Sequence, residues 1–307
     1  MIGLFGGAGF IGRHLCARLI AAGRDVRVLD RELALDTFAD HFHGIETAAM
    51  DFEDPSSYAA SLDGIEVAVM LVSASVPGTF ADDLAGEIVH NVLPYGRFVK
   101  AIEGHAAPGG LRRVVYLSSG GTVYGVPRQT PIAETHATRP ISPYGCGKLM
   151  IEDLLGTAGR GGGFDHVVLR PANPVGPGQS GERGQGLVAT ILHKAARGEA
   201  LTMWGDGSAV RDYFDVRDLA AAIEAVLDDP ALAGETLNVG SGEGLSMLDV
   251  IDLVTRATGR EVVVERRQGR GVDVPANVLD TARIRRLTGW RCEHDLTRTV
   301  AEMDEMG

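Results

Sequence analysis

The sequence predicts an α/β fold: a doubly wound parallel sheet followed by a smaller C-terminal α/β domain. Up to Arg170, short apolar strands alternate with segments of helical periodicity, which is typical of parallel sheets covered on both faces. A glycine-rich turn joins the first strand to the first helix, as in many nucleotide-binding sheets. After Arg170 the chain becomes rich in Pro and Gly, which indicates a change of domain.

The elements follow from hydrophobic periodicity taken along the chain. In the first part we expect strands at 1–5, 25–30, 65–73, 113–118 and 166–170, and helices at 11–22, 84–103 and 143–158. In the second part we expect a loop at 171–186, helices at 187–197, 215–227 and 247–258, and a strand at 262–266.

Composition excludes several classes of protein. The net charge of -12 over 307 residues disfavours a nucleic-acid or anionic-membrane surface. The three cysteines are far apart in sequence, and no apolar run reaches the roughly 20 residues that span a bilayer, so we expect a reduced, cytoplasmic setting. His41 and His43 have no third ligand nearby in sequence, so no metal site is predicted.

A dinucleotide site is predicted at the start of the chain. Gly6, Gly9 and Gly12 follow a strand and open a helix, where glycines permit a tight turn and close approach to a pyrophosphate. Asp30 ends the next strand, where its carboxylate can bind the ribose hydroxyls of NAD. Arg31, the next residue, leaves NADP as an open alternative.

Tyr144 and Lys148 are the candidate proton-transfer pair. Residues four apart share one helix face, so the ammonium of Lys148 can lie beside the phenol of Tyr144. A neighbouring cation favours the phenolate, and we therefore expect Lys148 to lower the pKa of Tyr144.

With these features placed, the chain resembles the extended short-chain dehydrogenase/reductase family, and within it the NAD-dependent nucleotide-sugar epimerase/dehydratase group. The resemblance runs nearly end to end. It rests on ordered motifs: Gly6–Gly12, Ser118–Gly125, Tyr144–Lys148, Leu169–Asn173, Gly205–Asp212, Leu237–Gly242 and Arg270–Asp273.

The resemblance implies two domains and a set of cofactor residues. Residues 1–172 would form a Rossmann NAD-binding domain, to which 213–243 would return, and 173–307 a substrate-binding domain. Besides the residues already named, it implies cofactor contacts from Phe10, Ile11, Asp51, Phe52, Leu71, Val72, Ser73, Asn91, Ser118 and Pro171, as well as Tyr144 and Lys148 themselves.

The resemblance also implies a substrate site, with one departure from the family pattern. Arg211 and Arg270 would bind the diphosphate, and Asn173 the sugar or a phosphate. Gly120 occupies the place of the usual catalytic Ser or Thr, so Thr122 or Ser119 would orient the substrate hydroxyl instead.

The expected activity is NAD-dependent 4-epimerisation of a nucleotide-diphosphate hexose through a transient 4-keto intermediate. A nucleotide-4-ketosugar reductase using NAD(P)H is the main alternative. A 4,6-dehydratase fits less well, because the acidic residues usual before the family's Val-Tyr-Gly are absent at Gly121 and Thr122. A non-catalytic dinucleotide sensor also stays open. The resemblance further suggests a homodimer.

Overall fold

The computed structural model describes residues 1–76, 79, 82–103, 110–161, 163–181, 186–268 and 274–306, which form two units, each described by itself. Unit 1 comprises Met1–Gly125, Ala137–Arg170 and Ala220–Leu237. Unit 2 comprises Val126–His136, Pro171–Leu219 and Asn238–Gly307. Residues 126–136 thus fall in unit 2, and the segment that returns to unit 1 is shorter than the predicted 213–243. The cofactor and substrate roles of the two parts stay predictions.

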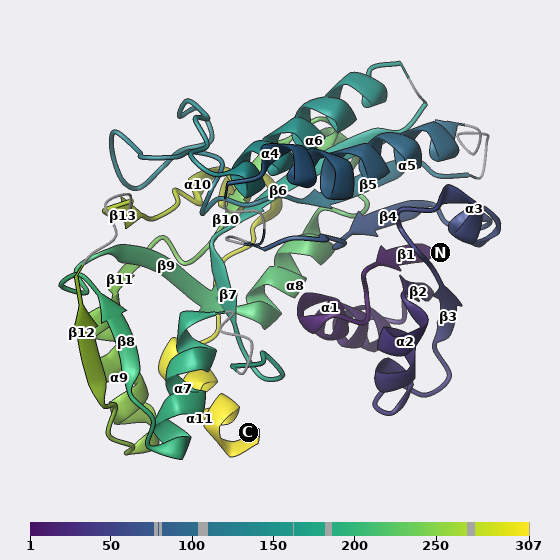
Figure 1. The fold of residues 1–307 in the computed structure, drawn as a ribbon. Coiled ribbons are helices and arrows are strands. Elements are labelled where there is room, and N and C mark those ends of the chain that lie inside the picture. Colours follow the sequence, from purple (N-terminus) through teal and green to yellow (C-terminus); the bar gives the residue numbers. More distant parts are fainter. Residues whose placement is uncertain are drawn as a thin grey trace. The chain divides into compact units, whose positions relative to one another are not determined.

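A seven-stranded sheet forms the centre of unit 1 (Figure 1). Its order is β10-β6-β5-β4-β1-β2-β3, and the pairs from β6 to β3 are parallel. The order reverses between β1 and β4, which is where ligands bind in such sheets. The strands are β1 (Ile2–Phe5), β2 (Val26–Asp30), β3 (Glu46–Ala49), β4 (Val67–Met70), β5 (Arg113–Leu117), β6 (Asp165–Pro171) and β10 (Thr236–Val239).

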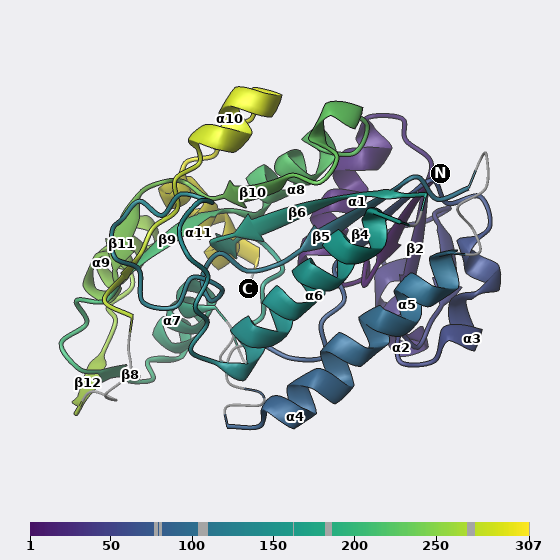
Figure 2. The same cartoon turned by 90° about the horizontal axis from the view of Figure 1, so that it is seen from above.

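Helices cover both faces of this sheet. In Figures 1 and 2, α5 and α6 run side by side on one face, and α1 lies on the other. Residues buried on the α5 and α6 side include a cluster of aromatic rings that contains Phe52, Tyr95, Phe98 and Tyr116. The helices are α1 (Phe10–Ala21), α2 (Glu32–Ala39), α3 (Pro55–Tyr58), the 3-10 turns η1 (Ala60–Leu62) and η3 (Pro230–Leu232), α4 (Leu84–Glu87), α5 (Leu93–Glu103), α6 (Pro143–Gly159) and α8 (Val216–Ala225).

The predicted helix 84–103 is interrupted by a π-helical turn, η2 (Ile88–Val92), between α4 and α5. Pro94 lies just after this turn and has no N–H to donate to the carbonyl four residues earlier. A regular α-helix is therefore not maintained there. Turns of this kind occur frequently at functional sites.

Unit 2 contains two small sheets and a cluster of helices. Strand β9 (Val210–Asp215) pairs with β7, β11 and β13, and β12 pairs with β8. Strand β7 (Asn173–Val175) lies in the predicted loop 171–186. A strand of three residues was not predicted there, because the many Pro and Gly residues around it are typical of a loop. The other elements are β8 (Leu201–Trp204), β11 (Gly244–Ser246), β12 (Val264–Arg267), β13 (Ala276–Asn277), α7 (Leu187–Arg197), α9 (Met247–Thr258), α10 (Ala282–Thr288) and α11 (Leu296–Met306). None of the described helices is both long and apolar enough to cross a membrane.

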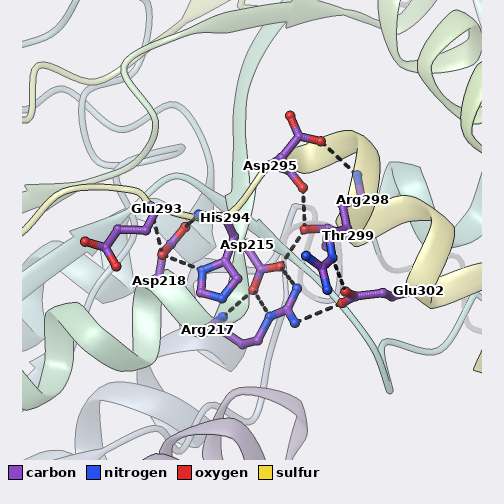
Figure 3. Close-up of polar contacts among 9 residues, drawn as sticks. All are labelled: Asp215, Arg217, Asp218, Glu293, His294, Asp295, Arg298, Thr299 and Glu302. Carbon is purple, nitrogen blue, oxygen red and sulfur yellow. Dashed lines mark hydrogen bonds and ion pairs between the residues drawn. The ribbon is translucent and has the colours of Figure 1, made fainter.

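A polar network in unit 2 joins the end of β9 to α11 (Figure 3). Asp215 is buried, and its carboxylate accepts two hydrogen bonds from the Arg217 guanidinium at 2.9 and 2.6 Å and one from Thr299 at 2.5 Å. Arg217 also pairs with Glu302 at 2.8 Å. Burial opposes ionisation of Asp215, but the hydrogen bonds from Arg217 and Thr299 outweigh it and lower its pKa.

We expect Asp215→Asn to lower the free energy of unfolding by about 2–4 kcal/mol at neutral pH, because it leaves Arg217 without its buried partner. Because folding lowers the pKa of this carboxyl, the carboxylate stabilises the fold at pH values above its pKa in the unfolded chain. This stabilisation is lost as the pH falls through its pKa in the folded protein. The difference in unfolding free energy between the native protein and Asp215→Asn should therefore become smaller in acid. Urea unfolding at several pH values measures this loss of stability. Glu302→Gln, at the partly exposed end of the network, should cost less than about 1 kcal/mol. An equal loss at all pH values would contradict the assignment.

Candidate functional site

A cavity of about 890 Å³ lies in unit 1 at the carboxyl ends of β1, β2 and β4. This is the edge of the sheet, beside the reversal of strand order, at which doubly wound folds bind ligands. Ten of the predicted cofactor residues line it: Gly6, Gly9, Asp30, Arg31, Asp51, Phe52, Leu71, Val72, Ser73 and Asn91. The structure thus brings together residues from five separate segments of the sequence.

The glycine-rich turn leaves room for a phosphate at the start of α1. Gly6 has φ +79°, and a Cβ there would lie 3.0 Å from the Val72 nitrogen. A Cβ on Gly12 would collide with the Gly7 backbone. Gly9 is the N-cap of α1 and has no side chain to cap the first N–H groups. These groups can therefore bind an anion, while Phe10 and Ile11 form the first turn behind them.

Asp30 is held by two backbone N–H groups. Its carboxylate accepts hydrogen bonds from the backbone N–H of Ala8 at 3.0 Å and of Arg31 at 2.8 Å. These bonds link the end of β2 to the glycine-rich turn. A fixed acceptor next to the phosphate site is the arrangement that a ribose diol requires.

The opposite wall of the cavity is formed by the segment after β4. The Tyr95 hydroxyl donates to the Val72 carbonyl at 2.8 Å, and the Asn91 amide accepts from Ala74 N–H at 2.8 Å. Asn91 therefore fixes this wall, and its predicted contact with the cofactor stays a prediction. Sequence reasoning missed other lining residues: Glu32, Ala49, Met50, Glu53, Ser57, Ala74, His90 and Tyr95. Several adjoin predicted residues in sequence, which is the signal that could have found them.

Tyr144 and Lys148 lie together on the first turns of α6. The Lys148 ammonium is 5.5 Å from the centre of the Tyr144 ring and 5.2 Å from that of Tyr116, within range of a cation–π interaction. Its Nζ also donates to the Leu117 carbonyl at 3.1 Å. The predicted side-by-side placement is therefore confirmed.

The predicted lowering of the Tyr144 pKa is wrong for this chain. Burial raises the pKa of Tyr144, and the carboxylate of Glu87 raises it further. Burial also lowers the pKa of Lys148 to about 8, against the opposing effects of Glu87 and Glu152. The spacing of four residues predicted that Lys148 lies beside Tyr144, but it could predict neither the burial of these side chains nor the approach of Glu87.

A buried ion pair fixes the strands beside this helix. Arg170 on β6 binds Glu152 on α6 with N–O distances of 3.0 and 2.5 Å and donates to the Tyr124 hydroxyl at 3.0 Å. The Ser118 hydroxyl donates to the same Glu152 carboxylate. Ser118 therefore has an internal partner here, and its predicted cofactor contact stays a prediction.

Thr122 lies against the helix turn that carries Tyr144. A Cβ on Gly145 would be 2.8 Å from the Thr122 carbonyl, so the loop after β5 touches α6 at that point. Within the described residues, the Thr122 hydroxyl oxygen is buried and has no hydrogen-bond partner. A buried hydroxyl of this kind is poised to bind an added group. Ser119, the other candidate, is partly exposed.

Two predicted substrate residues lie on neighbouring strands of unit 2. Asn173 on β7 donates to the Asp212 carbonyl at 2.8 Å, and Arg211 on β9 donates to the carbonyls of Val210 and Val274 at 2.8 Å each. Pro171, predicted to contact the cofactor, also belongs to unit 2. Arg270 lies outside the described residues. The roles of all four stay predictions.

Within the described ranges, no group of three or more His, Cys, Asp and Glu side chains is arranged to hold a metal ion. The His41 ring instead contacts the Thr37 carbonyl at 3.2 Å, within one helical turn.

Comparison with known families identifies the chain at the level of family. Residues 2–240 match the family model described as the NAD dependent epimerase/dehydratase family. The chain belongs to this family. It is therefore an enzyme of the family, and NAD is the cofactor that the family uses. The predicted family, fold class and cofactor are confirmed.

The chain is similar over its whole length to named epimerases. It is 32% identical over 307 residues to a UDP-glucose 4-epimerase of Mycolicibacterium smegmatis, covering 98% of this chain and 96% of the relative. A UDP-glucose 4-epimerase of Thermus thermophilus, solved in complex with NAD, has a TM-score of 0.88 at 27% identity, covering 99% and 98% of the chains. MoeE5, in complex with UDP-glucuronic acid and NAD, has a TM-score of 0.86 at 27% identity, covering 99% and 98%.

The cavity of unit 1 fits NAD. The uncapped start of α1, at a turn where only glycine fits, suits the pyrophosphate, and the fixed Asp30 carboxylate suits a ribose. The cavity volume is in the range of cofactor sites.

We expect Asp30→Asn to weaken NAD binding about tenfold or more, because a charge-assisted acceptor is lost while the side-chain shape is kept. Titration calorimetry measures the dissociation constant. Glu32→Gln is the matched control, since it removes an acid from the same cavity wall and should leave binding near normal. An unchanged dissociation constant for Asp30→Asn would exclude the ribose role.

Proposed function

We propose that this enzyme interconverts the C4 epimers of a UDP-hexose by transient oxidation at C4. The observation that carries the proposal is the Tyr144–Lys148 pair on α6, with Lys148 buried and with the loop that carries Thr122 packed against the same helix turn. Full-length similarity to UDP-glucose 4-epimerases supports both the reaction and the uridine base. The similarity to MoeE5 leaves the group at C6 of the sugar open.

In this mechanism the protein moves one proton and orients two molecules. Tyr144 takes the proton from the C4 hydroxyl and returns it after the sugar presents its other face. Bound NAD supplies the hydride acceptor, together with a positive charge that favours the phenolate. Lys148 would bind the nicotinamide ribose, and Asn173 and Arg211 the sugar diphosphate.

A 4-ketosugar reductase is the second candidate, and the raised pKa of Tyr144 favours it. A protonated phenol is the donor that reduction of a ketone requires. The behaviour of the cofactor separates the two reactions. An epimerase needs no net supply of NADH, whereas a reductase consumes it in proportion to product.

A panel of UDP-glucose, UDP-galactose, UDP-N-acetylglucosamine and UDP-glucuronic acid tests the proposal. Each is incubated with purified enzyme and NAD, and the products are identified by NMR. We expect one pair of C4 epimers to interconvert with no net change in NADH absorbance. Product formation only with stoichiometric NADH would establish the reductase instead, and no conversion of any UDP-sugar would refute the assigned substrate class.

We expect Tyr144→Phe to reduce turnover at least about a thousandfold, because the ring stays in place but cannot carry the proton. NAD binding, measured by calorimetry, should stay within about threefold of the native value. Substantial turnover in this variant would remove Tyr144 from the chemistry.

Thr122→Val should lower kcat about a hundredfold if its hydroxyl orients the C4 hydroxyl beside Tyr144. Valine has the shape of threonine, so folding should be little affected. Ser119→Ala is the matched control, and comparison of kcat for the two variants decides between the candidates. A loss in Ser119→Ala alone would assign the role to Ser119.

A further inference from the structure

Glu87 is a buried acid that neither the motifs nor the proposed chemistry explains. It ends α4, immediately before the π-helical turn, and its side chain is 1% exposed. Its carboxylate accepts hydrogen bonds from the Ser75 hydroxyl at 2.7 Å and the Asn91 amide at 3.1 Å. Both donors are neutral. A carboxylate in such surroundings needs a positive charge nearby to offset its desolvation.

The Glu87 carboxylate lies directly on the backbone of α6. A Cβ on Gly147 would be 2.5 Å from Glu87 Oε1 and 2.8 Å from its Cγ, so any side chain at 147 would displace the acid. Gly147 immediately precedes Lys148 and follows Tyr144 by three residues. The carboxylate is thus placed on the helix between the two residues of the catalytic pair.

The buried charges around α6 include one ion pair, and two further side chains, Lys148 and Glu87, that make no ion pair with any described residue. Glu152 is bound on both oxygens by the Arg170 guanidinium, so these two charges offset each other. Lys148 is 6% exposed, and its Nζ donates a hydrogen bond to the neutral Leu117 carbonyl. Among the described residues around this helix, one buried cation and one buried anion, Lys148 and Glu87, are left to offset each other. Consistent with this, Glu87 is the strongest influence that opposes the lowering of the Lys148 pKa by burial.

We propose that Glu87 is the counter-ion of Lys148, and that its buried carboxylate keeps this ammonium charged at neutral pH. Glu87 is then a positioning residue, which acts on the reaction through Lys148. Its use in catalysis rests on the proposed function, but the charge state of Lys148 does not. The other titratable groups that interact with this pair are Tyr116 from β5, and Tyr144 and Glu152 from α6. Tyr95 from α5 lies next to Tyr116 and interacts with Tyr144.

The chain is well suited to a direct test, because it contains only three lysines: Lys100, Lys148 and Lys194. NMR of protein labelled at lysine Nζ gives one titration curve for each of the three lysines. The curve that is missing in Lys148→Met belongs to Lys148. We expect Glu87→Gln, which keeps the side-chain shape, to lower the Lys148 pKa by about one unit, roughly a tenfold change in the ionisation constant. Asp83→Asn is the matched control: it removes an exposed acid at the start of α4 and keeps the cap.

A Lys148 curve that does not move in Glu87→Gln, or that moves equally in Asp83→Asn, would overturn the proposal. If Glu87→Gln does not fold, Gly147→Ala serves instead, because its methyl group displaces the carboxylate and should move the curve in the same direction. In the active enzyme, kcat of Glu87→Gln should fall at neutral pH and recover as the pH is lowered. A shifted curve without epimerase activity would refute the proposed function and leave the counter-ion role intact.

Discussion

The ion pair between Arg170 and Glu152 is the constraint on which the candidate site depends. It joins the end of β6 to α6, and through the Ser118 hydroxyl it also fixes the end of β5. Both partners are buried, so removal of either would leave a charge without water or a counter-charge. The same junction provides the Leu117 carbonyl that binds Lys148. Lys148 is therefore held by the sheet as well as by its own helix.

The burial of this helix affects the pKa values of Tyr144 and Lys148. Burial and the Glu87 carboxylate raise the pKa of Tyr144 and favour its protonated form. Burial lowers the pKa of Lys148, and Glu87 and Glu152 oppose this lowering. A raised pKa makes Tyr144 a better proton donor than acceptor, and a further positive charge nearby would favour its base form. Oxidised NAD carries one, so binding of the oxidised cofactor would favour the base form of Tyr144 and its reduction the acid form. The protonation state of Tyr144 would follow the redox state of the cofactor.

Local sequence patterns predicted much of the fold and of the cofactor site. Helices 187–197 and 247–258 were placed at their observed ends, and the glycine-rich turn and Asp30 line one cavity as predicted. Interactions between distant segments were not predicted. Glu87 approaches α6 only through the tertiary packing of two helices, and the wrong sign for the Tyr144 pKa follows from the omission of burial and of this acid. A pattern within one helix shows which charges share that helix and not which charges are packed against it.

Two glycines in the first turns of α6 allow other segments to pack closely against this helix. Glycine in a helix costs about 1 kcal/mol relative to alanine, yet Gly145 and Gly147 both lie between Tyr144 and Lys148. Each leaves room for a different group: Gly145 for the Thr122 carbonyl and Gly147 for the Glu87 carboxylate. Gly120 carries no hydroxyl, so Thr122 is a predicted substitute, and the close approach at Gly145 lets the loop that carries Thr122 pack against this turn. The two glycines therefore permit both close approaches to this helix, and a side chain at either position would force the neighbouring group to move.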